Sequence, residues 1–435
     1  MPTASRILWA ALSLVALPLG LAAQGDATPL TLGGAARIAA ERSAPAVVAR
    51  ERAVQGAARS AQYRADLLPS FTSEAVIDGG TDTPVPGGLG GVGLGSIALD
   101  RTVDMRLRVS QALFDLGAVG RWRAASADAD AAAHDARHSQ DRAGEDGALA
   151  YLRVLRAEAQ LAARIADSTL AWELLDIARR QLAAGTAIAL DVTRAESQLA
   201  AANSALIRGR NERARMELEL LRVLGLPIAT RVVLADSLRD PAAADLLVNE
   251  AEAVSGALNR RGDVLAAQAS GLAAERWIGA ARRERLPTVS VFAQAASNTN
   301  GTLDSHTYGL MVSLPLFDGF RRESRIAEGH AREREAEARY QDARRRTEVE
   351  VRSALLDLGA AREQVTAARV QLTLAEREVY QARERFSNGV AGNADVINAQ
   401  LTLNSARDVV VNALTAYHVA RVGLASAQGV TTGLP

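Results

Sequence analysis

The residues of this chain that first suggest chemistry are two histidines one helical turn apart, His134 and His138. Such a pair can hold a metal ion when a third ligand lies nearby. The neighbouring sequence offers no third ligand, so we interpret the pair as part of a solvated helix face. The chain contains no cysteine, which excludes disulfides, thiol catalysis and lipid attachment at an N-terminal cysteine.

Other catalytic signatures are also missing from the sequence. No glycine-rich phosphate loop, nucleophile elbow or pair of carboxylates occurs in a context that would support it. Positive and negative side chains balance at 50 of each, so no overall field favours nucleic acid. We expect a protein that is not an enzyme, needs no cofactor or metal, and has no nucleic-acid partner.

Two aspartates stand at equal distances from glycine turns. Asp191 lies six residues after Gly185, and Asp395 lies six residues after Gly389. Aspartate is a good N-cap, which explains both positions without any further role. A carboxylate that lines a constriction also favours cations, and capping and lining are compatible. Asp191 and Asp395 are therefore candidates for both roles.

A third group of charged residues follows a strict alternation of period two. Apolar and polar side chains alternate in the run Val103-Asp104-Met105-Arg106-Leu107-Arg108-Val109-Ser110. This pattern predicts a strand with one apolar face and one charged face. Asp104, Arg106 and Arg108 are better explained as a wetted lining than as a substrate site.

The elements that position these residues are long helices with a heptad pattern. From Val351 to Phe386 a large side chain recurs every seven residues, mostly with alanine three residues later, and the pattern restarts at Val396. Two such helices joined by a short glycine turn predict an antiparallel hairpin whose members approach closely. The same pattern occurs 204 residues earlier, from Val154 onward. The chain is therefore an internal duplication.

We divide the chain into a signal peptide, two repeats, a connector and a tail. The first residues combine Arg6 with a short apolar run and small residues, which is typical of a signal peptide. The predicted boundaries are a signal peptide at 1–23, a first repeat at 24–225, a connector at 226–245, a second repeat at 246–428 and a tail at 429–435. The first repeat contains a strand hairpin at 70–113 and a helical hairpin at 115–225. The second repeat contains a strand hairpin at 288–316 and a helical hairpin at 318–428.

Four strands with one apolar and one charged face cannot form a finished structure. A membrane β-barrel needs about eight strands to close, and strands of about ten residues suit a membrane. Two copies of the chain would supply eight strands, and three would supply twelve. The expected fold is thus mainly α, with duplicated long antiparallel hairpins and four β-strands per chain that contribute to a membrane barrel shared between copies.

The sequence resembles the TolC-like outer-membrane efflux proteins over nearly the whole mature chain. The resemblance rests on Leu-Pro pairs at Pro69 and Pro287, Phe-Asp pairs at Phe114 and Phe317, and the two glycine turns. It implies a homotrimer in the cell outer membrane, with a twelve-stranded barrel in the lipid and an α-helical tunnel through the periplasm. Such a protein is the exit duct of a tripartite efflux pump for small molecules. The alternatives are a type I protein secretion duct and, from another class, a soluble periplasmic coiled-coil adaptor.

The resemblance also implies partners and site residues. The partners are a periplasmic adaptor (membrane fusion) protein and an inner-membrane transporter of the RND or ABC type. Adaptors would dock at the hairpin tips, at Gly185, Thr186, Gly389 and Val390. Asp395 matches one acidic position of the tunnel mouth, while Asn398 stands at the second and Ala391 at the position of a basic latch residue.

Overall fold

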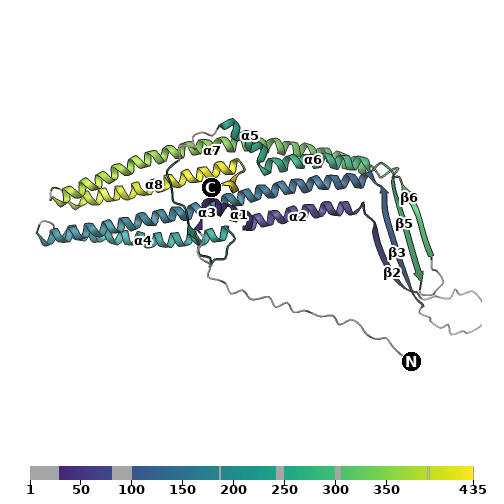
Figure 1. The fold of residues 1–435 in the computed structure, drawn as a ribbon, viewed down its shortest axis with the longest axis horizontal. Coiled ribbons are helices and arrows are strands. Elements are labelled where there is room, and N and C mark those ends of the chain that lie inside the picture. The colour runs from purple at the N-terminus through teal and green to yellow at the C-terminus, as the bar shows by residue number, and fades with distance from the viewer. Residues whose placement is uncertain are drawn as a thin grey trace, which may run out of the picture.

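The computed structural model describes residues 29–80, 100–185, 188–241, 249–298, 305–388, 390 and 392–434. The molecule is elongated, with a layer of long helices at one end and a sheet at the other (Figure 1). The predicted signal peptide at 1–23 lies outside the described residues.

Long helices dominate the structure, as predicted. The helices are α1 (Leu32–Arg42), α2 (Ala44–Ala65), α3 (Leu116–Ala183), α4 (Ala189–Val223), α5 (Glu250–Arg260), α6 (Gly262–Arg283), α7 (Arg321–Ser387) and α8 (Asn393–Ala427), with a short 3-10 turn, η2 (Thr431–Gly433). The strands are β1 (Pro29–Leu30), β2 (Ser70–Gly80), β3 (Asp100–Phe114), β4 (Val233–Leu234), β5 (Thr288–Asn298) and β6 (Ser305–Ser313). The duplicated hairpins and the four long strands confirm the predicted fold class, and β1 and β4 add a small parallel pair.

The heptad seam explains why α7 and α8 pair. Val351, Val365 and Val379 of α7 are buried, as are Val396 and Leu403 of α8. The alanines between them are buried too, including Ala368, Ala375, Ala399 and Ala406. Small side chains at alternate seam positions let the two backbones approach closely. The large residues then fill the remaining space, so the hairpin is stabilised along its length.

The long helices form one layer that is four helices wide. Helix α3 packs against α2 and α4 along one side and against α6 and α8 along the other, and α7 packs against α6 and α8 (Figure 1). Helices α2 and α4 thus form one edge of the layer, and α7 forms the other. Each repeat contributes one helix of 67 or 68 residues, which spans about 100 Å at 1.5 Å per residue.

The sheet continues this layer beyond the ends of α2, α3, α6 and α7. Its strand order is β2-β3-β5-β6, and all neighbours are antiparallel. The β3–β5 pairing, which joins the two repeats, shifts register between Ala112 and Phe114. Strands β2 and β6 are therefore the two edges of the sheet, on the same sides as the two edges of the helical layer (Figure 1).

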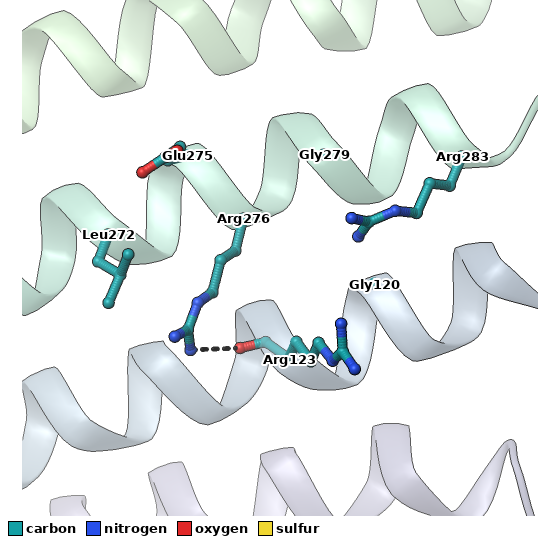
Figure 2. Close-up of a pocket in the computed structure, with 7 residues that line it drawn as sticks. All are labelled: Gly120, Arg123, Leu272, Glu275, Arg276, Gly279 and Arg283. Carbon is teal, nitrogen blue, oxygen red and sulfur yellow. Dashed lines mark hydrogen bonds between the residues drawn. The ribbon is translucent and has the colours of Figure 1, made fainter.

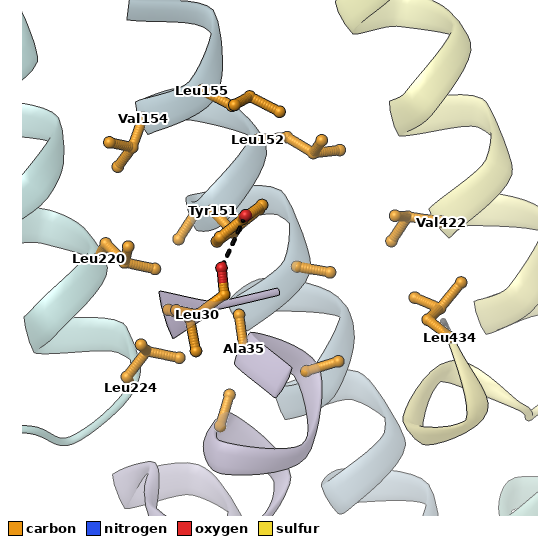
Figure 3. Close-up of a cluster of buried hydrophobic side chains, with 14 residues drawn as sticks. Leu30, Ala35, Tyr151, Leu152, Val154, Leu155, Leu220, Leu224, Val422 and Leu434 are labelled. Atoms are coloured by element: carbon orange, nitrogen blue, oxygen red, sulfur yellow. Dashed lines mark hydrogen bonds between the residues drawn. The ribbon is translucent and has the colours of Figure 1, made fainter. Parts of the chain in front are cut away.

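A compact apolar cluster at mid-body ties the N-terminal segment to the helices (Figure 3). Tyr151 of α3 is fully buried, and its hydroxyl donates to the carbonyl of Leu30 at 2.9 Å. Leu220 and Leu224 at the end of α4 and Val422 of α8 pack around it. The burial supplies most of the stabilisation, and the hydrogen bond satisfies the buried hydroxyl.

Two helix breaks lie at matching places in the repeats. The sequence predicts an interruption near Pro45, and the break falls at Ser43, which caps α2 while Pro45 stands in the first turn. In the second repeat Arg261 separates α5 from α6, a break that was not predicted. Arg261 is buried and pairs with Asp263 and Glu350, so it joins this elbow to α7.

The sequence predicts Asp115 and Asp318 as caps of the helices that follow them, and both carboxylates accept hydrogen bonds from amides of the first helical turn. Asp115 caps α3, and its carboxylate accepts from the amide of Ala118 at 2.7 Å. Asp318 pairs with the side chain of Arg322 at 2.8 Å and also accepts from the amides of Arg321 and Arg322, while Phe320 occupies the N-cap position of α7 in a left-handed conformation. The turn through Gly319 and Phe320 places the first residue of α7 at Arg321, three residues after the start of the predicted hairpin at 318.

Candidate functional site

The sheet has two chemically different faces. Because successive side chains of a strand point to opposite faces, the ladder assigns each residue to one of them. One face carries large apolar side chains that are strongly exposed, with Phe71 at 73%, Tyr308 at 84% and Leu310 at 62%. Met105 and Leu107 of β3 belong to the same face. An apolar patch of this extent needs lipid or protein to cover it.

The other face of the sheet carries the charged residues of β3. Asp104 and Arg106 approach to 3.8 Å, and the guanidinium of Arg108 lies 5.6 Å from the ring centre of Phe292. The ladder places Glu74 of β2 opposite Arg106. Neighbouring strands add polar residues to this face that were not predicted from the sequence, namely Thr72, Glu74, Gln294 and Thr307. Polar and apolar side chains alternate less regularly in β2, β5 and β6 than in β3, so only the pairing register assigns these four residues to the charged face.

The tip of the first hairpin is a tight turn with an apolar rim. Gly185 has φ +71°, a conformation that favours glycine. Ile188 and Leu190 follow it and are exposed at 61% and 49%. The N-cap of α4 is Ile188, so Asp191 lies in the first helical turn and is not the cap. Its charge there is favourable to the N-terminus of α4. Thr186 lies outside the described residues.

The second hairpin also carries an exposed apolar residue at its tip. Val390 is exposed at 71%, while Gly389 lies outside the described residues. Asp395 is in the first turn of α8, whose N-cap is Gly392, so the capping interpretation is wrong here as well. Asp395 and Asn398 are both exposed, three residues apart on one side of the helix. Because the Asp395 carboxylate is exposed and Asp395 is not the N-cap of α8, it can attract cations from solvent.

A partly buried polar cluster around Asp167 links the two hairpins about 27 Å from the tips, counting 18 residues from Asp167 to Gly185 at 1.5 Å each. Asp167 of α3 is buried and pairs with Arg407 of α8 at 2.7 Å. Arg164 pairs with Asp408 at 2.6 Å. Burial raises the pKa of Asp167, although Arg407 and Arg164 favour its charged form. No sequence pattern predicted this cluster, because its members lie some 240 residues apart.

The outer edge of α7 carries a second apolar seam. Val349, Leu356 and Val370 recur at multiples of seven and are exposed. Ala360, Ala367 and Leu374 follow four residues after positions of that series, on the same side. This seam lies on the face of α7 away from α8. It has the pattern of a helix that packs on two sides, and the residues that the structure describes cover only one of them.

The histidine pair is not a solvated face, contrary to our interpretation. Gly262 at the start of α6 lies against the α3 backbone, where an added Cβ would come within 2.6 Å of the carbonyl of His134 and 2.7 Å of the amide of His138. Both side chains are half-buried. His138 lies 3.9 Å from Asp263, and burial lowers its pKa. The pair belongs to the junction of α3 with the α5–α6 elbow.

Across the parts of the chain that the structure describes, we find no helix with the length and apolar character needed to cross a membrane.

Comparisons with known proteins agree with this geometry. The family model described as "Outer membrane efflux protein" matches residues 39–226 and 253–430. Protein CyaE of Bordetella pertussis is 30% identical over 285 residues, which cover 63% of this chain and 58% of that protein. The chain thus matches little more than half the length of this curated relative.

Solved structures show the same fold. The CmeC outer membrane channel of Campylobacter jejuni is 18% identical with a TM-score of 0.73, covering 92% of this chain and 86% of that one. The outer membrane protein VceC of Vibrio cholerae is also 18% identical, with a TM-score of 0.71 and coverage of 92% and 96%. With the family match extending over most of the chain, this protein belongs to the outer membrane efflux protein family.

Proposed function

We propose that this protein is the outer-membrane exit duct of a tripartite efflux pump and forms a passive conduit for small molecules. The observation that carries the proposal is the two-faced sheet. Its apolar face suits lipid and its charged face suits water, yet the outer edges of strands β2 and β6 have no partner strand in the part of the chain that the structure describes. An open edge next to an exposed apolar face is unstable in isolation.

Copies of the chain complete the wall in this proposal. Strand β6 of one protomer pairs with β2 of the next, and the alternating strand directions make that contact antiparallel like the others. The exposed seam of α7 packs against the α4 edge of the neighbouring protomer, where Ile207 and Leu218 are exposed. Three copies give the homotrimer with twelve strands, which the family membership supports. The charged faces then line a wet channel.

The partners follow from the family and the tips. A periplasmic adaptor docks on the exposed apolar rim that Ile188, Leu190 and Val390 form beside the turns. An inner-membrane transporter of the RND or ABC type supplies the energy. The duct itself lies in the outer membrane and reaches into the periplasm.

The test is to purify the mature protein in detergent, measure its oligomeric state by native mass spectrometry, and record conductance in planar bilayers. We expect a trimer with stable, ion-conducting channels. The variant Leu356→Arg places a charge on the α7 seam and should reduce trimer formation, whereas Asp357→Arg, next to it on the helix, is the control. A monomer that stays dissolved without detergent and conducts no ions would refute the proposal.

A further inference from the structure

A groove between α3 and α6 lies close to the sheet and has no role in the conduit described above. It encloses about 540 Å³ and is lined by Gly120, Arg123, Leu272, Glu275, Arg276, Gly279 and Arg283. Figure 2 shows the side chains of Arg123, Arg276 and Arg283 reaching from the two helices into the space between them.

The three arginines of this groove lack carboxylate partners. Arg276 donates to the backbone carbonyl of Arg123 at 3.2 Å, and none of the three forms an ion pair with any residue that the structure describes. The groove therefore contains three guanidinium groups and one carboxylate, that of Glu275.

On the opposite face of α6, where α3 and α7 pack against it, arginines do have carboxylate partners. There Arg121 and Arg325 both pair with Glu284, at 3.3 and 2.7 Å. Arg332 pairs with Glu328 at 2.6 Å. The three arginines of the groove thus differ from those on the opposite face, because their charges are not neutralised by a paired carboxylate.

Two glycines shape the groove. At Gly120 an added Cβ would lie 2.8 Å from the Cα of Ala280, so α3 and α6 approach closely at its floor. At Gly279 an added Cβ would meet only the Nη1 of Arg283, at 3.8 Å. The absence of a side chain at Gly279 keeps the groove open between the arginines.

The groove lies on the convex side of the helical layer. On the other side, Tyr63 of α2 and Trp277 of α6 meet across α3 with ring centres 5.6 Å apart, and Trp277 donates to Asp128 at 2.8 Å. Helices α2 and α6 flank α3, so their side chains can reach one another across α3 only on the concave side of the layer. Arg123 is five residues from Asp128, roughly 140° around the helix, and so faces outward.

The groove is also at a defined height below the sheet. Arg283 is the last residue of α6, and β5 begins at Thr288. Arg123 is seven residues into α3 from Leu116, about 10 Å at 1.5 Å per residue. If the sheet spans the apolar core of a membrane, the headgroup layer occupies roughly the next 5 to 8 Å. Long arginine side chains bridge the remaining distance.

We propose that this groove binds the phosphate of a phospholipid headgroup from the leaflet that meets the helical end of the sheet. The inference rests on the proposed function, because it requires the sheet to lie in a membrane. Guanidinium groups bind phosphate oxygens through paired, charge-assisted hydrogen bonds. Three of them around one cavity suit a phosphate, and an anionic headgroup suits the net positive charge. Bound lipid would fix the depth of the wall in the membrane.

The test measures lipid binding to the purified full-length mature protein. Native mass spectrometry in detergent would follow the binding of phosphatidylglycerol to the wild type and to the triple variant Arg123→Gln, Arg276→Gln, Arg283→Gln. We expect about a tenfold loss of affinity, consistent with the removal of charged hydrogen bonds. The control Arg52→Gln, Arg59→Gln, Arg64→Gln removes the same charge from the neighbouring helix α2 and should bind lipid normally. Equal loss in both variants, or none in the first, would overturn the proposal.

Two further measurements identify the site and its ligand. Gly279→Leu fills the groove without changing its charge and should weaken binding, whereas Gly359→Leu at an open position of α7 should not. Excess inorganic phosphate should fail to displace the lipid, and complete displacement would mean a site for free phosphate instead. Oligomeric state and conductance are recorded on the same samples. Trimeric, conducting protein that binds no lipid refutes only this inference, while monomeric protein refutes the proposed function.

Discussion

At the scale of single residues, the tips show how position decides the task of an aspartate. Asp191 and Asp395 were both candidates for N-caps, yet Ile188 and Gly392 occupy the cap positions. Neither cap residue contributes a side-chain hydrogen bond to its helix. Both carboxylates stand at the third residue of their helices, within the first turn, where they compensate the helix dipole. The glycine spacing therefore locates the turn, while the cap depends on local backbone geometry that the sequence does not determine.

The first prediction concerns Asp395. Replacing Asp395 with Ala should lower the cation selectivity of the reconstituted channel, because each protomer loses one carboxylate at the mouth. Asn398→Asp should increase the selectivity, since it adds a carboxylate three residues further along the same side. The reversal potential under a salt gradient measures both, and an unchanged potential in both variants would show that this ring does not control ions.

The second prediction concerns Asp141 of α3. Burial raises the pKa of Asp141 to about 6, although Arg261 opposes the shift. A carboxyl group with a raised folded-state pKa contributes stability at low pH that is lost as the pH rises through that value. Asp141→Asn should therefore have little effect at pH values below the ordinary aspartate pKa of about 4 and should raise the thermal midpoint above pH 6. Thermal denaturation in detergent across this range tests it, with the exposed Asp135→Asn as control. Equal midpoints at neutral pH would contradict it.

At the scale of elements, the periodic patterns predicted most of what the structure contains. The heptads of α7 and α8 and the alternation of β3 depend on neighbours in the sequence, so each pattern identified its element. The break at Arg261 and the link through Asp167 depend on contacts between distant segments. A buried arginine and a buried aspartate look like surface residues in a sequence rich in both. Such cross-layer pairs could not be predicted without the fold.

The third prediction tests the link between the hairpins. Asp167→Ala removes the charged hydrogen bond that the partly exposed Arg407 makes to a buried carboxylate, and it should destabilise the protein by about 2 kcal/mol. The double variant with Arg407→Ala should lose less than the sum of the single changes, because the two residues interact. Denaturant unfolding of the four proteins gives the coupling energy. Additive losses would mean that the pair does not join α3 to α8 in solution.

At the scale of the whole molecule, each protomer is an incomplete wall with edges on opposite sides. Strands β2 and β6 do not touch within the chain, and α4 and α7 lie at the matching edges of the helical layer. The sequence predicted this incompleteness by counting strands. It could not determine how many copies close the ring, because the curvature between copies depends on contacts that no single chain contains.

The fourth prediction uses the absence of cysteine from the chain. One cysteine placed on β2, at Ser70 or Thr72, and one on β6, at Thr307 or Met311, should form disulfides only between protomers. A series of these pairs is needed to find the register across the new edge. Non-reducing electrophoresis should show a ladder that ends at a closed trimer. A ladder that ends at a dimer would indicate eight strands, and intramolecular bonds alone would contradict the edge assignment.

The opposite placement of the two edges has a genetic consequence. A chain with substitutions that disrupt only β6 and α7 would keep an intact β2 and α4 edge. Wild-type copies could therefore still assemble with it. Every assembly that incorporates it would stop one junction short of closure. Such alleles should behave as dominant ones when both forms are expressed together, whereas damage at the hairpin tips would spare the ring and leave only its contacts with other components impaired.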